Sequence, residues 1–225
     1  MRKIFLVSCG LLFLVGTIGC AQLGLAPTPL EPLSLSGAGN FTSKPFEINT
    51  KEWQINWKYT AKALPNFVLY VYPEGEKVQF VEMVKRPRSA KGSGSTYLYT
   101  KPGKYYVKVI TQGNPSWEVE VIRAGLSKPL ESPVSFRGTT DTTTKPFKIE
   151  GKEFIVYYAI EPITALMYEG AGQMIALYRR GETESYIDMS IVGAGSGSKV
   201  YEGPGEYYIK VQCPMVKSWD ITVTE

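Results

Sequence analysis

The sequence contains no histidine among its 225 residues. This absence removes the commonest general base and the commonest nitrogen ligand for zinc, so it excludes many enzyme classes and most zinc sites. The sequence also shows no recognisable arrangement of a nucleophile with a base. We therefore expect a protein that is not an enzyme and that needs no cofactor and no metal.

Cysteine is scarce as well, with only Cys9, Cys20 and Cys213 in the chain. Cys9 lies inside an apolar N-terminal run, and the other two cannot form a disulfide framework. Cys213 ends a predicted strand in surroundings that offer no cluster of positive charge. We expect it to be an inert, partly buried thiol, because reactive cysteines need an accessible and electropositive site.

The chain has little excess charge of either sign. Its formal net charge of +4 includes Arg2 and Lys3, and without these two the remaining 23 basic residues balance 21 acidic residues to within +2. The two signs alternate along most of the chain, which excludes the basic stripe of a nucleic-acid-binding protein. Helical periodicity is missing, whereas 15 Tyr residues, 22 Gly and 15 Pro are typical of strands separated by turns. The expected fold class is all-β.

Residues 1–19 have the pattern of a bacterial signal peptide, with Arg2 and Lys3 before an apolar stretch and small residues after it. The segment Thr17-Ile18-Gly19-Cys20 resembles a lipobox, although Thr17 stands where leucine is usual. The resemblance implies that Cys20 becomes the lipid-modified first residue, carrying palmitate-like acyl chains that anchor the protein to a membrane. The protein would then lie outside the cytoplasm, on the cell membrane or the outer membrane. An ordinary signal peptide cut nearby, or an uncleaved anchor, is the alternative.

The body of the chain repeats itself once, in four blocks that keep their order at offsets of 101 to 103 residues. The paired blocks are 42–48 with 143–149, 92–95 with 195–198, 102–109 with 204–211, and 117–121 with 219–223. We therefore predict two tandem domains, with repeat 1 at 37–123 and repeat 2 at 135–225. A proline-rich tether at 20–36 would precede them, and a linker at 124–134 would join them.

Within each repeat, short segments of alternating polarity predict around seven strands and hence two antiparallel β-sandwich domains of jelly-roll-like type. In repeat 1, Trp53, Ile55, Trp57 and Tyr59 share one face of a strand whose other face is polar. The corresponding strand of repeat 2 is apolar on both faces. We expect its second face, which includes Tyr157, to pack on the first domain or on a partner.

The pattern Gly-x-Tyr-Tyr-(Val/Ile)-Lys-Val at 103–109 and 205–211, followed by a strand that begins with tryptophan, resembles the end of the bacterial pre-peptidase C-terminal domain. The resemblance covers about a third of each repeat and implies a noncatalytic module of secreted proteins. Such modules usually carry an acidic segment ahead of a central strand, where this chain has Pro-Asn-Phe-Val-Leu at 65–69. A calcium site therefore does not follow from the resemblance.

The sharpest candidate for ligand binding is a cationic loop at 85–91, which contains Lys85, Arg86, Arg88 and Lys91. Repeat 2 has no charge in the corresponding region, so the loop is not a shared structural element. Clustered positive charges bind anionic polymers or lipid headgroups, and each charge near a membrane contributes about 1 kcal/mol. The alternative is a loop that is merely solvated.

Three further patterns have a structural and a functional interpretation. Tyrosines at 97, 99, 105–106 and 207–208 could stack on sugars, although their repetition favours packing. Glu182, Glu184 and Asp188 could form a carboxylate cluster, although a solvated strand face is the simpler account. The repeated Gly-Ser-Gly-Ser lacks the context of a phosphate-binding loop, and we interpret it as a flexible connection between strands.

The leading functional hypothesis is a noncatalytic lipoprotein of the cell envelope whose tandem domains bind or scaffold a partner, either envelope polysaccharide or another protein. One alternative is an accessory module that binds carbohydrate or cell-wall polymer. Another is a protein of domains associated with a secreted hydrolase. Exposed aromatic side chains on one sheet face would favour the carbohydrate-binding alternative.

Overall fold

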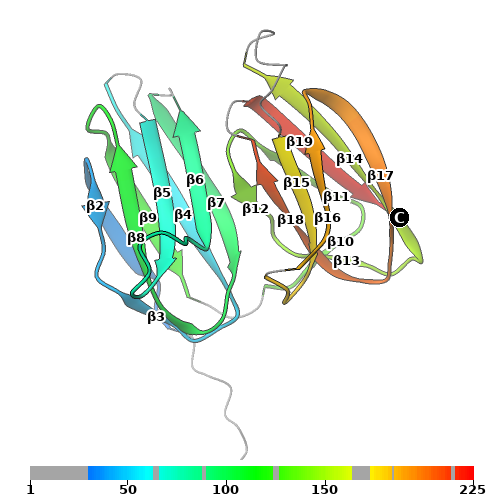
Figure 1. Cartoon of the computed structure of the whole chain (residues 1–225), viewed down its shortest axis with the longest axis horizontal. Coiled ribbons are helices and arrows are strands. Elements are labelled where there is room, and N and C mark those ends of the chain that lie inside the picture. The colour runs from blue at the N-terminus through cyan, green and yellow to red at the C-terminus, as the bar shows by residue number, and fades with distance from the viewer. Residues whose placement is uncertain are drawn as a thin grey trace, which may run out of the picture.

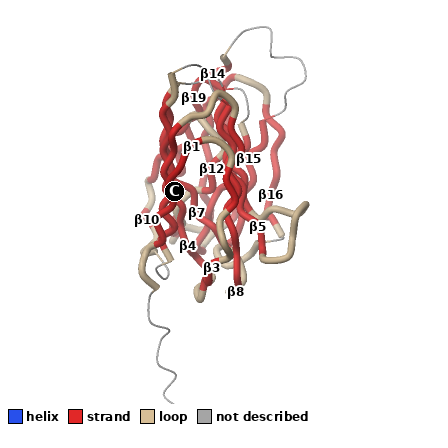
Figure 2. Tube along the Cα trace, turned by 90° about the vertical axis from the view of Figure 1, so that its left-hand side faces the viewer, coloured by secondary structure: helices blue, strands red, loops and turns tan. Residues whose placement is uncertain are grey.

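The protein folds into two all-β domains that stand side by side (Figure 1). The structure is a computed structural model that describes residues 30–62, 66–87, 90–123, 127–163, 173–183, 185–213 and 216–225. Every regular element in these ranges is a strand, as the colouring of Figure 2 shows. The predicted all-β sandwich fold is confirmed.

The first domain consists of two facing sheets. One has the order β1-β9-β4-β7, and the other has the order β2-β8-β5-β6 with β3 also paired to β8. The strands are β1 (Leu33–Ala38), β2 (Phe41–Thr42), β3 (Phe46–Ile48), β4 (Glu52–Thr60), β5 (Asn66–Pro73), β6 (Glu82–Pro87), β7 (Lys91–Tyr99), β8 (Gly103–Thr111) and β9 (Ser116–Ile122).

The second domain repeats this arrangement, with sheets in the order β11-β19-β14-β17 and β10-β13-β18-β15-β16, and with β12 paired to β18. Its strands are β10 (Leu130–Glu131), β11 (Val134–Gly138), β12 (Thr142–Thr143), β13 (Phe147–Ile149), β14 (Glu153–Pro162), β15 (Gln173–Arg179), β16 (Tyr186–Val192), β17 (Gly195–Glu202), β18 (Gly205–Gln212) and β19 (Val216–Thr224). The sole strand without a counterpart in the described part of the first domain is β10, which runs parallel to β13.

The topology is that of a jelly roll. If β2 and β3 are counted as one interrupted strand, eight antiparallel strands of the first domain fill two four-stranded sheets, and strands that are distant in sequence lie next to each other. The first domain begins earlier than expected, because β1 starts at Leu33 inside the segment that we assigned to the tether. The alternation of Leu33 and Leu35 with serines, after the prolines, is the signal for this strand.

Alternating side chains build the core of each sandwich. Trp53, Ile55, Trp57 and Tyr59 are all buried on the inner face of β4, as the sequence predicts, and Trp57 and Tyr59 stack on Phe67 of the opposite sheet. The second domain has its own core, built around Phe147, Phe154, Tyr207 and Trp219. Two separate cores are consistent with two duplicated domains.

The repeated Gly-Ser-Gly-Ser is part of a strand, so our prediction of a flexible connection is wrong. The motif lies in β7 and in β17, where Gly92, Gly94 and Gly197 face large rings of β4 and β14. A Cβ atom on Gly94 would lie 2.7 Å from the Trp57 ring, and one on Gly197 would lie 2.4 Å from the hydroxyl oxygen of Tyr158. Glycine is needed at these positions because the ring occupies the space of a side chain.

The apolar second face of β14 does not pack on the first domain, contrary to one of our two expectations. Tyr157 is 44% exposed on this face, and the adjacent Val200 of β17 is 58% exposed. The two domains meet instead through β12, β15 and β18 of the second domain. Packing of the β14 face on a separate partner remains a prediction.

Candidate functional site at the contact between the domains

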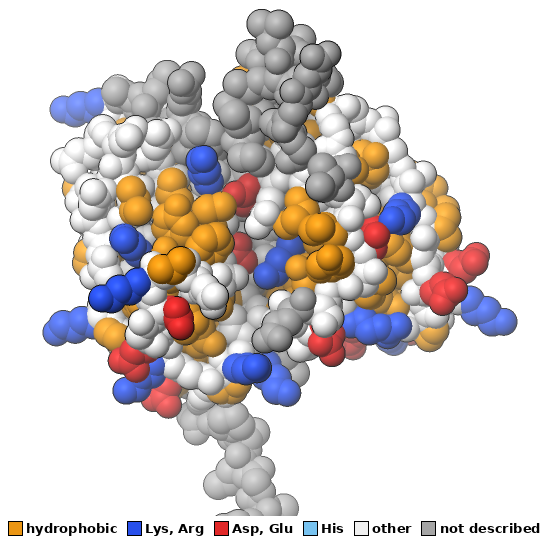
Figure 3. All heavy atoms as spheres, in the orientation of Figure 1, with side chains coloured by type: hydrophobic (Ala, Val, Ile, Leu, Met, Phe, Trp, Pro, Cys, Tyr) orange, Lys and Arg blue, Asp and Glu red, His pale blue; other side chains and the backbone are white. Residues whose placement is uncertain are grey.

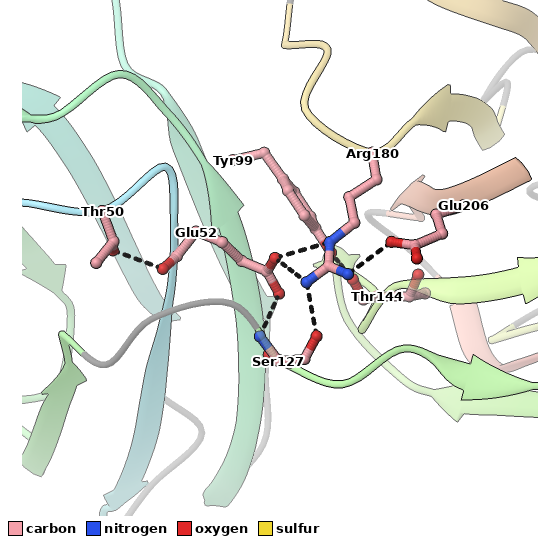
Figure 4. Close-up of polar contacts among 7 residues, drawn as sticks. All are labelled: Thr50, Glu52, Tyr99, Ser127, Thr144, Arg180 and Glu206. Atoms are coloured by element: carbon pink, nitrogen blue, oxygen red, sulfur yellow. Dashed lines mark hydrogen bonds and ion pairs between the residues drawn. The ribbon is translucent and has the colours of Figure 1, made fainter. Parts of the chain in front are cut away.

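The two domains are joined by an ion pair that is almost fully buried (Figure 4). Glu52, at the start of β4, has a side chain that is 1% exposed, and Arg180, just after β15, has one that is 13% exposed. The Arg180 guanidinium donates to one Glu52 carboxylate oxygen from Nε at 3.0 Å and from Nη2 at 2.7 Å. It also donates to Glu206 at 2.7 Å and to the Ser127 carbonyl at 2.6 Å. Arg180 therefore connects both domains and the linker.

A stack of tyrosine rings lies beside this ion pair. Tyr99 of β7 stacks on Tyr208 of β18 with 3.8 Å between ring centroids, and Tyr208 stacks on Tyr178 of β15 at 5.0 Å. The Tyr99 hydroxyl donates to the Thr144 carbonyl at 3.3 Å. Together with Ala176 these rings form a third, smaller apolar cluster, which lies between the two cores. The cluster removes aromatic surface of both domains from water, so it favours docking.

A second buried carboxylate, that of Glu82, accepts a hydrogen bond across the contact between the domains. The Thr143 hydroxyl of β12 donates to the Glu82 carboxylate of β6 at 2.8 Å, and the Thr143 amide donates to the Thr96 hydroxyl of β7 at 3.0 Å. Burial raises the pKa of Glu82 to about 7, against the opposing effects of Lys210 and of the hydrogen bonds from Thr143 and Met83. Burial also raises the pKa of Asp141 to about 6, although Asp141 accepts a hydrogen bond from the Cys213 amide.

These raised pKa values predict that the protein loses stability as the pH rises. Glu82 ordinarily titrates near 4.5, so between about pH 4.5 and 7 the unfolded chain gives up this proton while the folded chain still holds it. The free energy of unfolding should therefore decrease across that range, by about 3 kcal/mol, and then level off. Asp141 adds a decrease of the same sign between about pH 4 and 6.

Urea unfolding at a series of pH values, for the natural chain and for Glu82→Gln, measures this effect. Glutamine keeps the shape and an acceptor for Thr143 but does not titrate, so the upper part of the decrease should disappear. A pH profile that is unchanged in Glu82→Gln would show that Glu82 is not the titrating group.

The structure changes our view of the predicted cationic loop. Lys85 and Arg86 belong to β6 and pair with Val68 and Phe67 of β5, and Lys91 begins β7. Lys85 and Lys91 are exposed, whereas Arg88 lies outside the described residues. Three of the four charges that we assigned to one loop therefore lie on two strands, β6 and β7, which belong to different sheets. Cys20, the predicted lipid attachment site, also lies outside the described residues.

Most of the tyrosines that we considered for sugar stacking are buried. Tyr99, Tyr105, Tyr207 and Tyr208 are at most 5% exposed, and they serve in the cores or in the contact between the domains. The packing interpretation is therefore confirmed for these four. Cys213 is also buried, and burial raises the pKa of its thiol to about 12, which fits the inert thiol that we expected.

The carboxylate cluster that we weighed as an alternative to a solvated strand face does not form among the described residues. Asp188 pairs with Lys199 at 2.8 Å and accepts hydrogen bonds from Tyr201 at 2.8 Å and Ser190 at 3.0 Å, so its role is structural. Glu184 lies outside the described residues. No group of three or more acidic or cysteine side chains suited to a metal ion occurs in the described ranges. Those ranges also hold no helix long and apolar enough to cross a membrane.

The outer face of the β1-β9-β4-β7 sheet carries a shallow polar trough. Asn56 lies at its centre and donates to Glu120 at 2.9 Å, and its side-chain oxygen accepts hydrogen bonds from Ser95 at 2.7 Å and Gln54 at 2.6 Å. These groups satisfy one another, so the trough has the character of a solvated sheet face and does not present converging free donors.

The other sheet of the first domain exposes an aromatic surface. Tyr70, Tyr72, Phe80 and Tyr106 contact one another on the outer face of β5 and β8, with ring centroids 5.2 to 6.4 Å apart. Figure 3 shows hydrophobic side chains gathered over this front of the first domain, with positively charged side chains beside them. We call these four residues the aromatic face. Phe80 is 42% exposed, Tyr70 and Tyr106 are half-buried and Tyr72 is 7% exposed, so the face presents partly exposed rings, which are common at interaction surfaces.

Sequence analysis did not identify the residues that join the domains. Glu52, Glu82 and Arg180 lie in no recognised motif, Thr143 only begins the repeated block 143–149, and the partners across the contact are 47 to 128 positions away in the chain. A weak signal did exist. Tyr99 corresponds to Glu202 in repeat 2, and a position at which duplicated strands differ this strongly is a candidate for a contact made by one copy alone.

No protein-family model matches the chain, and a search of curated proteins gives no match. Among solved structures, the chain is similar to the M60 catalytic domain with the CBM51-1 and CBM51-2 domains from Clostridium perfringens ZmpB, at 10% identity and a TM-score of 0.25. The match covers 86% of this chain and 34% of that chain. The chain spans about a third of that structure's length, and a similarity this distant carries no conclusion about function. The fold and the site define a protein of two docked jelly-roll domains.

Proposed function

We propose that the protein is a noncatalytic lipoprotein of the bacterial cell envelope, anchored through Cys20, in which the two sandwiches form one rigid scaffold for a partner outside the membrane. The basic residues, the apolar stretch and Gly19-Cys20 at the start of the chain support the anchor. The acyl chains would hold the protein at a membrane face, since each buried methylene contributes about 0.8 kcal/mol.

The observation that supports a scaffold most strongly is the use made of the buried charged groups. In an enzyme, buried carboxylates with strongly raised pKa values are the first candidates for proton transfer. Here Glu82 is bonded to Thr143 and Glu52 is paired with Arg180, each across the contact between the domains. Their chemistry serves to fix one domain against the other. A fixed pair of sandwiches holds its outer faces at a constant spacing, as a scaffold must.

The anchor is tested by expressing the full chain in a bacterial host and measuring intact mass and partition into detergent. We expect a lipid mass increment and partition into the detergent phase, and we expect Cys20→Ala to abolish both. Cys9→Ala is the matched control and should change neither property, because Cys9 lies inside the predicted signal peptide. A natural chain that is secreted without lipid would contradict the proposed anchor.

A further inference from the structure

The same outer surface occurs on both domains, and only on the second domain does the other domain cover it. The register of the strands fixes the correspondence, because Leu69 pairs with Val109 in the first domain as Ile175 pairs with Val211 in the second. Tyr72 and Tyr106 of the first domain therefore correspond to Tyr178 and Tyr208 of the second.

The stacking and the hydrogen bonds of these tyrosines correspond as well. Tyr72 and Tyr106 stack at 5.2 Å, and Tyr178 and Tyr208 stack at 5.0 Å. The Tyr106 hydroxyl donates to the Glu76 carbonyl, and the Tyr208 hydroxyl donates to the Glu182 carbonyl at the corresponding turn position. In the second domain this surface receives β7 of the first domain, with Tyr99 stacked on Tyr208. In the first domain the same surface is the aromatic face, where Phe80 of the same domain packs on Tyr72.

The second domain in turn has an edge that corresponds to the docking edge of the first domain. Glu52 pairs in register with Tyr99, and Glu153 pairs with Glu202 at the matching position of β14 and β17. Glu153 and Glu202 are both exposed. Each domain therefore has one receiving face and one docking edge, and the chain itself occupies one of the two faces and one of the two edges.

The unused face also offers a base to the acid of the unused edge, although at a different position from that in the observed contact. In the observed contact, Glu52 on the edge meets the Arg180 and Glu206 pair on the face. On the unused surfaces, Glu153 on the edge would meet Glu74 and Lys104, which form a pair 4.0 Å apart at the corresponding positions. Glu74 stands at the Arg180 position and Lys104 at the Glu206 position, so Lys104 is the base that Glu153 would meet, and Glu74 and Glu202 are like charges beside it.

A second acid and a second base also occupy corresponding positions in the two domains. Glu82 of the edge is influenced by Lys210 of the face in the observed contact. At the unused surfaces the corresponding residues are Asp188 and Lys108, but Asp188 already forms an ion pair with Lys199 of its own domain at 2.8 Å. Preservation of the aromatic pair, with Lys104 opposite Glu153, indicates that the unused face still suits a β-sandwich edge of this kind.

We propose that the aromatic face of the first domain binds the β14–β17 edge of the second domain in another copy of this chain, head to tail. The occupant is a protein edge and not a sugar, because the corresponding face already binds such an edge within the chain. This contact is heterologous, because it joins two different surfaces. Each pair of copies therefore keeps one free face and one free edge, and further copies can add to form a linear assembly.

The contact between copies should be weaker than the contact within the chain. Glu202 and Val200 stand where Tyr99 and Tyr97 stand in the first domain, so the third stacked ring is missing. We therefore expect that copies anchored close together on one membrane associate reversibly. The inference deepens the proposed scaffold role and rests on it, but loss of the lipid in Cys20→Ala would leave the docking surfaces intact.

Cross-linking of full-length chains in the membranes of the expressing host tests the proposal. Thr96 and Thr143 touch in the observed contact, and the corresponding residues of the unused surfaces are Lys199 and Thr42. One tagged copy carries Thr42→Cys and a differently tagged copy carries Lys199→Cys, and a short bis-maleimide joins them. The matched control replaces Lys199→Cys with Arg137→Cys, which lies on β11 at the opposite edge of the sheet and is exposed.

We expect cross-linking between 42 and 199 to exceed cross-linking between 42 and 137 by about tenfold. Lys104→Glu alone and Glu153→Lys alone should each reduce the yield about fivefold, and the two together should restore it, because both side chains are exposed and their exchange recreates the opposite charges. Equal yields at 137 and 199, or a yield indifferent to the charge exchange, would overturn the proposal. Equal yields combined with binding of purified wall polysaccharide that requires Tyr106 would assign the face to carbohydrate instead.

Discussion

Replacing Arg180 with methionine should decrease the free energy of unfolding by about 3–5 kcal/mol. The substitution leaves the Glu52 carboxylate, which is 1% exposed, in the contact without its positive partner. A buried charge without a partner is far more costly than the loss of a good ion pair, because the desolvation of the carboxylate is no longer offset. Urea unfolding followed by tryptophan fluorescence measures the loss, since both domains contain tryptophan.

The double variant Arg180→Met with Glu52→Gln separates the pair from the buried charge. It should recover most of the stability, because neither charged group is then left in the contact. The matched control is Lys58→Met, which removes an exposed ion pair with Glu118 at 2.9 Å and should change the stability by less than about 1 kcal/mol. A loss in Arg180→Met no larger than that in Lys58→Met would contradict a fixed contact between the domains.

Replacing Tyr208 with alanine should decrease the free energy of unfolding by about 3–5 kcal/mol. Its ring is fully buried and is stacked between Tyr99 and Tyr178, so the substitution leaves a cavity and removes two aromatic contacts. Denaturant unfolding again measures the effect, and small-angle scattering should show a wider distribution of distances between the domains.

The internal repeat provides the control for this variant. Tyr106 occupies the corresponding position of the first domain, where it stacks on Tyr72 alone and is half-buried. Tyr106→Ala should therefore reduce the stability by about 1–2 kcal/mol and leave the distance distribution unchanged. Equal effects of the two substitutions would mean that Tyr99 contributes nothing to the stability of the stack.

The fold was largely predictable because it depends on local periodicity and on the duplication. The alternation of Trp53, Ile55, Trp57 and Tyr59 gives the strand and its buried face directly. The four repeated blocks give two domains, since matching segments in the same order specify the same topology twice. The very short strands β2 and β3 were missed because two or three residues carry no measurable alternation.

The contact between the domains was not predictable from the same patterns. Arg180 follows a strand like any solvated turn residue, and it becomes buried only because Glu52 and the Ser127 carbonyl approach it from 53 or more positions away. The glycines of the Gly-Ser-Gly-Ser motif illustrate the same limit. Their composition indicates a flexible segment, and only the rings of Trp57 and Tyr158 in the neighbouring strands explain why glycine stands there.

The position of β1 has a mechanical consequence. Its six residues pair with β9 from Leu33 with Val121 to Ala38 with Ser116, antiparallel and without interruption. A force applied to the N-terminal segment along the axis of β1 is directed along this ladder, so it must shear the hydrogen bonds of the strand together instead of opening them one after another. The pair of β1 and β9 therefore resists such a force along the direction in which two paired strands are hardest to separate.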